Sequence, residues 1–151
     1  MAKYEIIDGV GIIPQGVTKI EDEAFYGCEN LTSIVIPDSV TTIGECAFSH
    51  CENLTSIVIP DSVTTIEYKV FSDCLSLKNI VIPDSVTEIG QVAFYGCKSL
   101  TNIVIPDSVT TIESGAFRGC MALEKICVSK GKVDYFKRLL PTELRDKIVE
   151  R

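Results

Sequence analysis

The chain has 151 residues, 46% of them apolar, which is enough for one domain with a buried core. No apolar run reaches the about 18 residues of a membrane-spanning helix, and the N-terminus lacks the basic-then-apolar layout of a signal peptide. The net charge is −7, and residues 1–127 hold 7 Lys or Arg against 17 Asp or Glu. This acidic balance argues against nucleic acid as a partner.

The first twelve residues depart from the pattern that follows and are expected to form an N-terminal cap. Residues 4–7 are typical of an edge strand, and Asp8-Gly9 is typical of a turn. Gly11 stands where the next repeat carries an inward-facing Ile34.

From residue 13 to residue 128 the sequence repeats every 23 residues. Residues 28–43 and 51–66 are identical, and an Ile-Pro step begins at Ile13, Ile36, Ile59, Ile82 and Ile105. A fixed period of this size is the signature of a solenoid, in which each coil buries its apolar face against its neighbours. We therefore predict one repeat domain over residues 1–151, with five 23-residue repeats in residues 13–128.

One coil illustrates the expected structure of all of them. Residues 56–59 alternate and are rich in β-branched side chains, which predicts a strand with Ile57 inward and Val58 outward. Pro60 ends the strand, since it cannot donate to the ladder. Val63 and Ile66 turn inward again through a short second extended segment. Apolar residues at helical offsets in residues 47–54 predict a short helical or 3₁₀ turn.

Stacking of the coils places equivalent residues in columns. One aromatic column is expected on the side away from the strands: Phe25, Phe48, Phe71, Phe94 and Phe117. Five of the seven cysteines form another: Cys28, Cys51, Cys74, Cys97 and Cys120. Their spacing matches neither a disulfide framework nor a zinc site, which favours buried thiols in a reducing compartment.

The repeat ends after Val128, and residues 129–151 are predicted to be a helical C-terminal cap. Residues 129–132 form a loop and residues 133–140 suit a helix. Pro141 is expected to begin a second helix that carries Leu144, Ile148 and Val149 on its apolar side.

The 23-residue pattern I-P-x-x-V-x-x-I-x-x-x-A-F-x-x-C-x-x-L-x-x-I, with the ending that follows it, resembles the bacterial BspA-like leucine-rich repeat family. The resemblance implies a curved, right-handed leucine-rich-repeat solenoid. A parallel β-sheet would line its concave face, with short strands or helical turns on the other side. It also implies protein–protein or adhesion-type recognition and carries over no catalytic residues.

The outward side chains of the strands are the candidate partner-binding site, because a solenoid binds with its sheet face and the adjoining loops. They are Ser33, Val35, Ser56, Val58, Asn79, Val81, Asn102 and Val104. An exposed apolar stripe with a polar rim can mark an interaction site. The alternative is that Val only satisfies β-propensity there, and that the Asp following each Pro only forms the turn.

No catalytic residue, metal ligand or cofactor is predicted. His50 is the lone histidine and adjoins Cys51, but Cys–His catalysis needs a cleft and an orienting third group. A regular rod offers neither, so His50 is interpreted as a surface residue.

The sequence therefore favours a non-enzymatic binding module whose partner is a protein or an extended peptide, with no insertion into a membrane. The alternatives are a structural or self-associating, homo-oligomeric scaffold, or a fragment of a surface adhesin. The missing signal peptide and the free cysteines favour the cytoplasm, whereas the family resemblance implies the cell surface or secretion.

Overall fold

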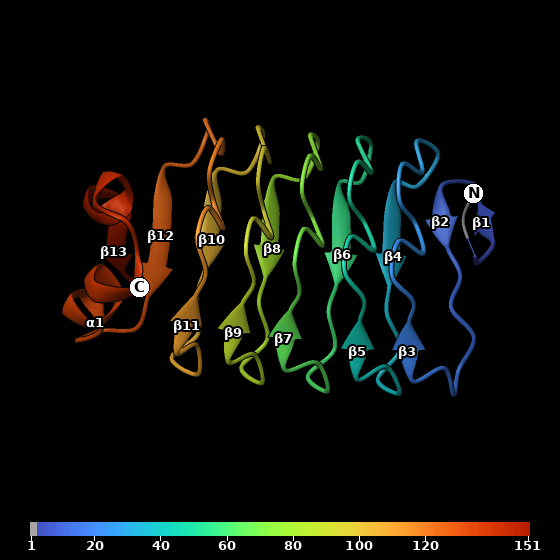
Figure 1. The fold of residues 1–151 in the computed structure, drawn as a ribbon, viewed down its shortest axis with the longest axis horizontal. Coiled ribbons are helices and arrows are strands. Elements are labelled where there is room, and N and C mark those ends of the chain that lie inside the picture. The colour runs from blue at the N-terminus through green and yellow to red at the C-terminus, as the bar shows by residue number, and fades with distance from the viewer. Residues whose placement is uncertain (1–2) are drawn as a thin grey trace.

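The computed structural model describes residues 3–151, which wind into a rod of stacked coils (Figure 1). Each full coil contributes one strand to a first row along the rod and a two-residue strand to a second row. The first row contains β2 (Val10–Gly11), β4 (Ser33–Val35), β6 (Ser56–Val58), β8 (Asn79–Val81), β10 (Asn102–Val104) and β12 (Lys125–Val128). The second contains β3 (Lys19–Ile20), β5 (Thr42–Ile43), β7 (Thr65–Ile66), β9 (Glu88–Ile89) and β11 (Thr111–Ile112).

Neighbouring strands of a row run parallel, and paired residues are one repeat apart. Ile34 pairs with Ile57, and Ile80 pairs with Ile103, so each side chain lies against its counterpart in the next coil. Strand pairing is interrupted once in each row, between β6 and β8 and between β5 and β7. At the N-terminal end, β1 (Ile6–Ile7) pairs antiparallel with β2. The predicted fold class, a solenoid with a parallel sheet and short strands on the other side, is confirmed.

The predicted helical or 3₁₀ turn at residues 47–54 does not form. Cys46 and His50 have positive φ, 59° and 60°, a conformation outside the right-handed helical region. The segment instead makes separate turns, in which the N–H of Ser49 bonds the carbonyl of Cys46 and that of Cys51 bonds Phe48. The apolar spacing matched a helix because both conformations bring every third or fourth side chain inward.

The N–H groups between these turns bond the next coil, and we call this line of hydrogen bonds the turn ladder. Those of Cys46, Phe48 and His50 donate to carbonyls of the following coil at 3.0, 3.0 and 2.9 Å. The acceptors are Tyr68, Val70 and Ser72. Positive φ at two positions per coil is therefore what turns alternate N–H groups along the rod.

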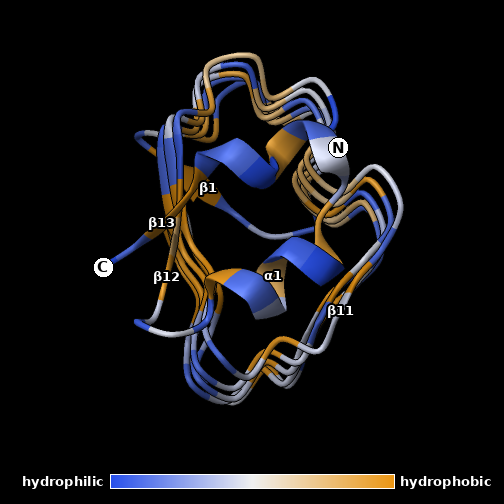
Figure 2. Cartoon of the chain, turned by 90° about the vertical axis from the view of Figure 1, so that its left-hand side faces the viewer, coloured by the Kyte–Doolittle hydropathy of each residue, from blue (hydrophilic) through white to orange (hydrophobic). Residues whose placement is uncertain are grey.

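The core is a set of columns, seen end-on as an apolar interior in Figure 2. Neighbouring rings of the Phe column are stacked, with centroids 5.2–5.7 Å apart, and Tyr4 adds a ring on Phe25 at 5.7 Å. The predicted aromatic column is thus present. Ser49 and Ser72 are the buried polar residues of the core, and their hydroxyls bond each other at 2.7 Å.

The C-terminal segment covers the end of the rod with α1 (Val133–Leu139), a 3₁₀ helix (Thr142–Lys147) and β13 (Ile148–Glu150) (Figure 2). The predicted second helix is wrong at its end. Ile148 and Val149 lie in β13, which pairs in parallel with β12. The free edge of β12 offers these two β-branched residues a ladder, which a helix would have left unpaired. Phe136, Leu140 and Ile148 are buried against the core.

Candidate functional site

The predicted site residues lie in one row of strands and are brought together by the coil-to-coil register. We call this surface the sheet face: Ser33, Val35, Ser56, Val58, Asn79, Val81, Asn102 and Val104. Val35 pairs with Val58, and Val81 with Val104, so the valines form two paired stretches along the rod, separated where β6 and β8 do not pair. The polar residues form a second line, because Ser33 pairs with Ser56 and Asn79 with Asn102.

The valines of the sheet face are unusually open for large apolar side chains. Val35 is 67% exposed, Val58 52% and Val81 73%, whereas their neighbours Ile57 and Ile80 are buried. Val104 and Ser33 are half-buried. The exposed fraction follows from strand alternation, which turns every second residue away from the core.

A row of carboxylates borders the sheet face at the turn that follows each strand. Asp38, Asp61, Asp84 and Asp107 are all exposed. In residues 3–151 the single ion pair joins His50 Nε2 and Asp73 Oδ2 at 3.5 Å, so the four rim carboxylates have no cationic partner there. The rim is therefore a source of negative potential beside an apolar line.

His50 and Cys51 point in different directions. The His50 side chain is 43% exposed and lies between Asp73 and the Tyr26 ring, whose centroid is 5.4 Å from that of the imidazole. The Cys51 thiol is buried and donates to the carbonyl of Phe25 at 3.0 Å. This geometry does not form a nucleophile–base pair.

The cysteine column is a structural element. The thiols of Cys74 and Cys97 repeat the contact of Cys51, each donating to a Phe carbonyl of the preceding coil, at 3.2 and 3.1 Å. Burial raises the pKa of Cys51 to about 12 and that of Cys74 well above its usual value. These side chains therefore stay protonated and act as hydrogen-bond donors rather than as nucleophiles.

Glutamates lie along the second row of strands: Glu88 within β9, Glu67 directly after β7 and Glu45 two residues after β5. Glu45, Glu67 and Glu88 lie together around a shallow cleft. Partial burial, and then the charges of Glu45 and Glu88, raise the pKa of Glu67 above its usual 4.5. Nevertheless, no cluster of His, Cys, Asp and Glu in the described part of the chain is arranged to hold a metal ion.

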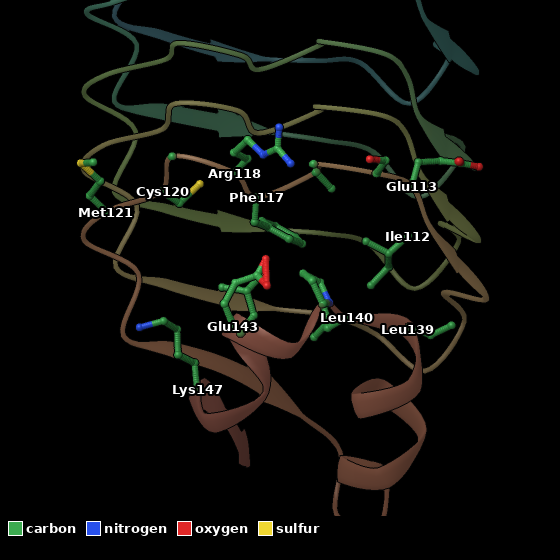
Figure 3. A pocket seen from close by; sticks show the side chains of 16 residues that line it. Ile112, Glu113, Phe117, Arg118, Cys120, Met121, Leu139, Leu140, Glu143 and Lys147 are labelled. Carbon is green, nitrogen blue, oxygen red and sulfur yellow. The ribbon is translucent and has the colours of Figure 1, made fainter.

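One cavity was not anticipated from the sequence. A cleft of about 670 Å³ separates the turns of the last repeat, residues 112–121, from the C-terminal segment, residues 139–147 (Figure 3). Its existence depends on where the tail docks, which no local pattern specifies. Within residues 3–151, no helix has the length and apolarity needed to span a bilayer.

A parallel solenoid with inward Leu, Ile and Phe at fixed positions of each coil defines the class of leucine-rich-repeat proteins. Residues 12–138 match the model of the BspA type leucine rich repeat region in six copies, and the chain belongs to this family. No curated protein sequence matches the chain.

Solved structures of bacterial leucine-rich repeat proteins are similar to this fold. A leucine rich cell surface protein of Faecalibacterium prausnitzii is 42% identical, with a TM-score of 0.82 over 85% of this chain and 34% of its own. A leucine-rich repeat protein of T. pallidum is 40% identical, with a TM-score of 0.76 over 79% of this chain and 58% of its own.

The pneumococcal vaccine antigen PcpA shares the fold at 20% identity, with a TM-score of 0.69 over 95% of this chain and 40% of its own. In all three comparisons the chain spans less than two thirds of the relative's length: 34%, 58% and 40%.

Proposed function

We propose that the chain is a protein-interaction module that binds an extended segment of a partner protein along the sheet face. The observation that carries the proposal is the line of exposed valines along the rod, Val35, Val58 and Val81. Val35 is in register with Val58, and Val81 is in register with the half-buried Val104. Each exposed Val is one repeat from the next, so the line presents the same apolar contact at every coil.

The chemistry of the sheet face indicates what such a segment would contain. Apolar side chains would cover Val35, Val58 and Val81, and their burial is worth about 25 cal/mol per Å² of apolar surface. Hydroxyl and amide groups of the polar line would bond the partner's polar groups. The carboxylate rim favours Lys or Arg next to the apolar residues, since complementary charge steers association.

The family relatives support a partner outside the cell. The Faecalibacterium prausnitzii structure is that of a cell surface protein, and the chain resembles a third of it. Equivalent coils that carry nearly the same outward residues favour a long or repetitive partner over one small ligand, because a small-ligand site needs different groups on neighbouring strands.

The test is capture of extracellular bacterial or host proteins on the immobilised chain, quantified by mass spectrometry. Val58→Glu with Val81→Glu is expected to abolish capture, since both side chains are exposed and the fold does not depend on them. Thr64→Glu with Thr87→Glu is the matched control, because it adds the same charge at exposed positions on the other side of the coil.

Loss of partners in the valine variant alone supports the sheet face. Full retention of every partner in that variant, at unchanged circular dichroism, rejects it. Addition of salt is expected to weaken capture by the unmodified chain, because salt screens the charges of the carboxylate rim.

Self-association is the second candidate, and the first strands favour it. β1 is an edge strand, and Ile7 on it is 53% exposed, next to Val10 and Ile12 at 40% each. Exposed apolar edges can pair with a second chain. Light scattering over a concentration series distinguishes the two, because a strict monomer at high concentration counts against a scaffold built from this edge.

A further inference from the structure

At the C-terminal end of the rod, the last set of N–H groups of the turn ladder has no acceptors in the described part of the chain. In four successive coils, three alternate N–H groups donate to carbonyls of the next coil: residues 23, 25 and 27; 46, 48 and 50; 69, 71 and 73; and 92, 94 and 96. The equivalent groups of the fifth coil belong to Gly115, Phe117 and Gly119, and none has an acceptor in residues 3–151. Three backbone donors in a row are thus left open.

The C-terminal segment replaces the next coil on one side of the rod only. β13 continues the first row of strands by pairing with β12. No residue of the segment continues the turn ladder, and the 670 Å³ cleft lies where the next set of turns would be. The three open donors all belong to residues that line this cleft.

The Phe column also ends at the cleft. Figure 3 shows the Phe117 ring on the cleft wall, with Leu140 and Glu143 of the C-terminal segment opposite. Phe117 stacks on Phe94 at 5.4 Å on its inner side, and no aromatic ring of the described chain stacks on its outer side. Phe117 is nevertheless only 4% exposed, because it lies in the core cluster together with Leu140 of the C-terminal segment. At the other end of the column, Tyr4 already fills the corresponding place on Phe25.

The second row of strands ends at the same place. Ile112 of β11 lines the cleft and is half-buried, while its equivalents Ile43, Ile66 and Ile89 are 0–2% exposed. Its carbonyl lacks the donor that Ile66 and Ile89 receive from Gly90 and Glu113. The cleft wall therefore repeats the backbone groups to which each coil bonds the next, while the Phe117 ring lies beneath the C-terminal segment.

We propose that this cleft binds a short extended segment of a partner protein that carries an aromatic side chain. The backbone carbonyls of the segment accept hydrogen bonds from Gly115, Phe117 and Gly119. Its aromatic ring displaces the side chains of the C-terminal segment that cover Phe117, stacks there and continues the column. This is strand addition to an open backbone edge, applied to a ladder of turns.

A second copy of the chain does not fit as the occupant. Stacked end to end, a copy would have to offer the carbonyls of its first turns, but Ala24 already accepts the N–H of Lys3. Its first Phe is covered by Tyr4. The cleft therefore suits a free polypeptide segment rather than the capped end of another rod.

The test uses a capped synthetic peptide with the sequence of residues 89–96, because this segment occupies the equivalent place on the preceding coil. There the carbonyls of Gln91, Ala93 and Tyr95 accept the ladder bonds, and Phe94 stacks on Phe71. In a ¹⁵N-labelled protein, the peptide is expected to shift the amide resonances of Gly115, Phe117 and Gly119 saturably. The same peptide with Phe94→Asp is expected to bind about tenfold more weakly, through loss of ring burial and stacking.

Protein variants supply the matched comparison. Phe117→Leu keeps an apolar side chain and removes the outer ring, so peptide affinity should fall about tenfold. Phe94→Leu removes an inner ring of the column and loses about as much packing as Phe117→Leu does. It leaves Phe117 in place, so the affinity for the peptide should be retained.

Absence of shifts at millimolar peptide, or shifts confined to the strands of the sheet face, would overturn the proposal. Shifts of the three amides with protein concentration alone would also overturn it, since a second copy would then be the occupant. Sheet-face variants Val58→Glu and Val81→Glu should leave peptide binding unchanged, which separates this site from the proposed function.

Discussion

Glu67 is an acidic side chain whose surroundings oppose its charge. Burial and the neighbouring Glu45 and Glu88 raise its pKa in the folded chain above 4.5. The folded state therefore takes up a proton more readily than the unfolded state, and protonation of Glu67 stabilises the fold. That stabilisation is full below pH about 4.5 and is lost as pH rises through the raised pKa.

Replacement of Glu67 by a neutral residue should remove the free-energy cost of holding its charge in the folded chain. Glu67→Gln is expected to raise the melting temperature at pH 7 and to have little effect near pH 4, as measured by circular dichroism. Glu52→Gln, an exposed acid on another corner of the same coil, should change neither value. Equal gains from both variants would attribute the effect to net charge instead.

Residue direction within a strand is the part of the structure that the sequence predicts best. Alternation in residues 56–58 places Ile57 inward and Val58 outward, and the exposed fractions agree. The same logic does not tell whether an exposed Val binds anything, because β-propensity selects Val at such positions even on an idle surface. The role of the sheet face remains a proposal for this reason.

At the scale of elements, α1 depends on one buried side chain. Phe136 is fully buried, and Tyr135 packs edge-on against it at 4.9 Å while its hydroxyl donates to the carbonyl of Val109 at 2.8 Å. The helix has seven residues, which is too short to be stable alone, so this packing holds it in place.

Phe136→Ala is expected to destabilise the chain by about 3–5 kcal/mol, the usual cost of truncating a buried Phe. Urea unfolding followed by circular dichroism measures it. Lys137→Ala, on the exposed side of α1, should cost less than about 0.5 kcal/mol. A loss below about 1 kcal/mol for Phe136→Ala would show that the C-terminal segment does not close the core.

Two elements differ from the sequence prediction for a shared physical reason. Apolar spacing suggested helical structure at residues 47–54 and again at Ile148 and Val149. In both places the chain instead satisfies backbone groups of an adjacent coil, through the turn ladder and through the edge of β12. Apolar spacing reports which side chains face inward, but it contains no information about which neighbour the N–H groups bond.

At the scale of the whole molecule, each strand pairs with strands of the adjacent coils, so one complete coil should be removable. Deletion of residues 51–73 joins His50 to Cys74, and equivalent residues meet again because the period is 23. The shortened chain is expected to fold with the same circular dichroism spectrum and a lower melting temperature, because one set of interfaces is lost.

Deletion of 12 residues, 51–62, is the control, since it destroys the register and should leave the chain unfolded or aggregated. Loss of folding in the 23-residue deletion as well would contradict independent coils. The period alone predicts this architecture, whereas the cleft beside Phe117 follows only from where the tail docks.

The interruption of pairing between β6 and β8 has a mechanical consequence. Between these two coils the second row remains paired through β7 and β9, and the turn ladder is complete, with Lys69, Phe71 and Asp73 bonded to the next coil. Under tension along the rod, these two coils should therefore separate at the first row of strands and remain bonded at the turn ladder, which would act as the hinge. Such an opening would widen the spacing between Val58 and Val81, so a partner that pulls on the rod would alter the surface it holds.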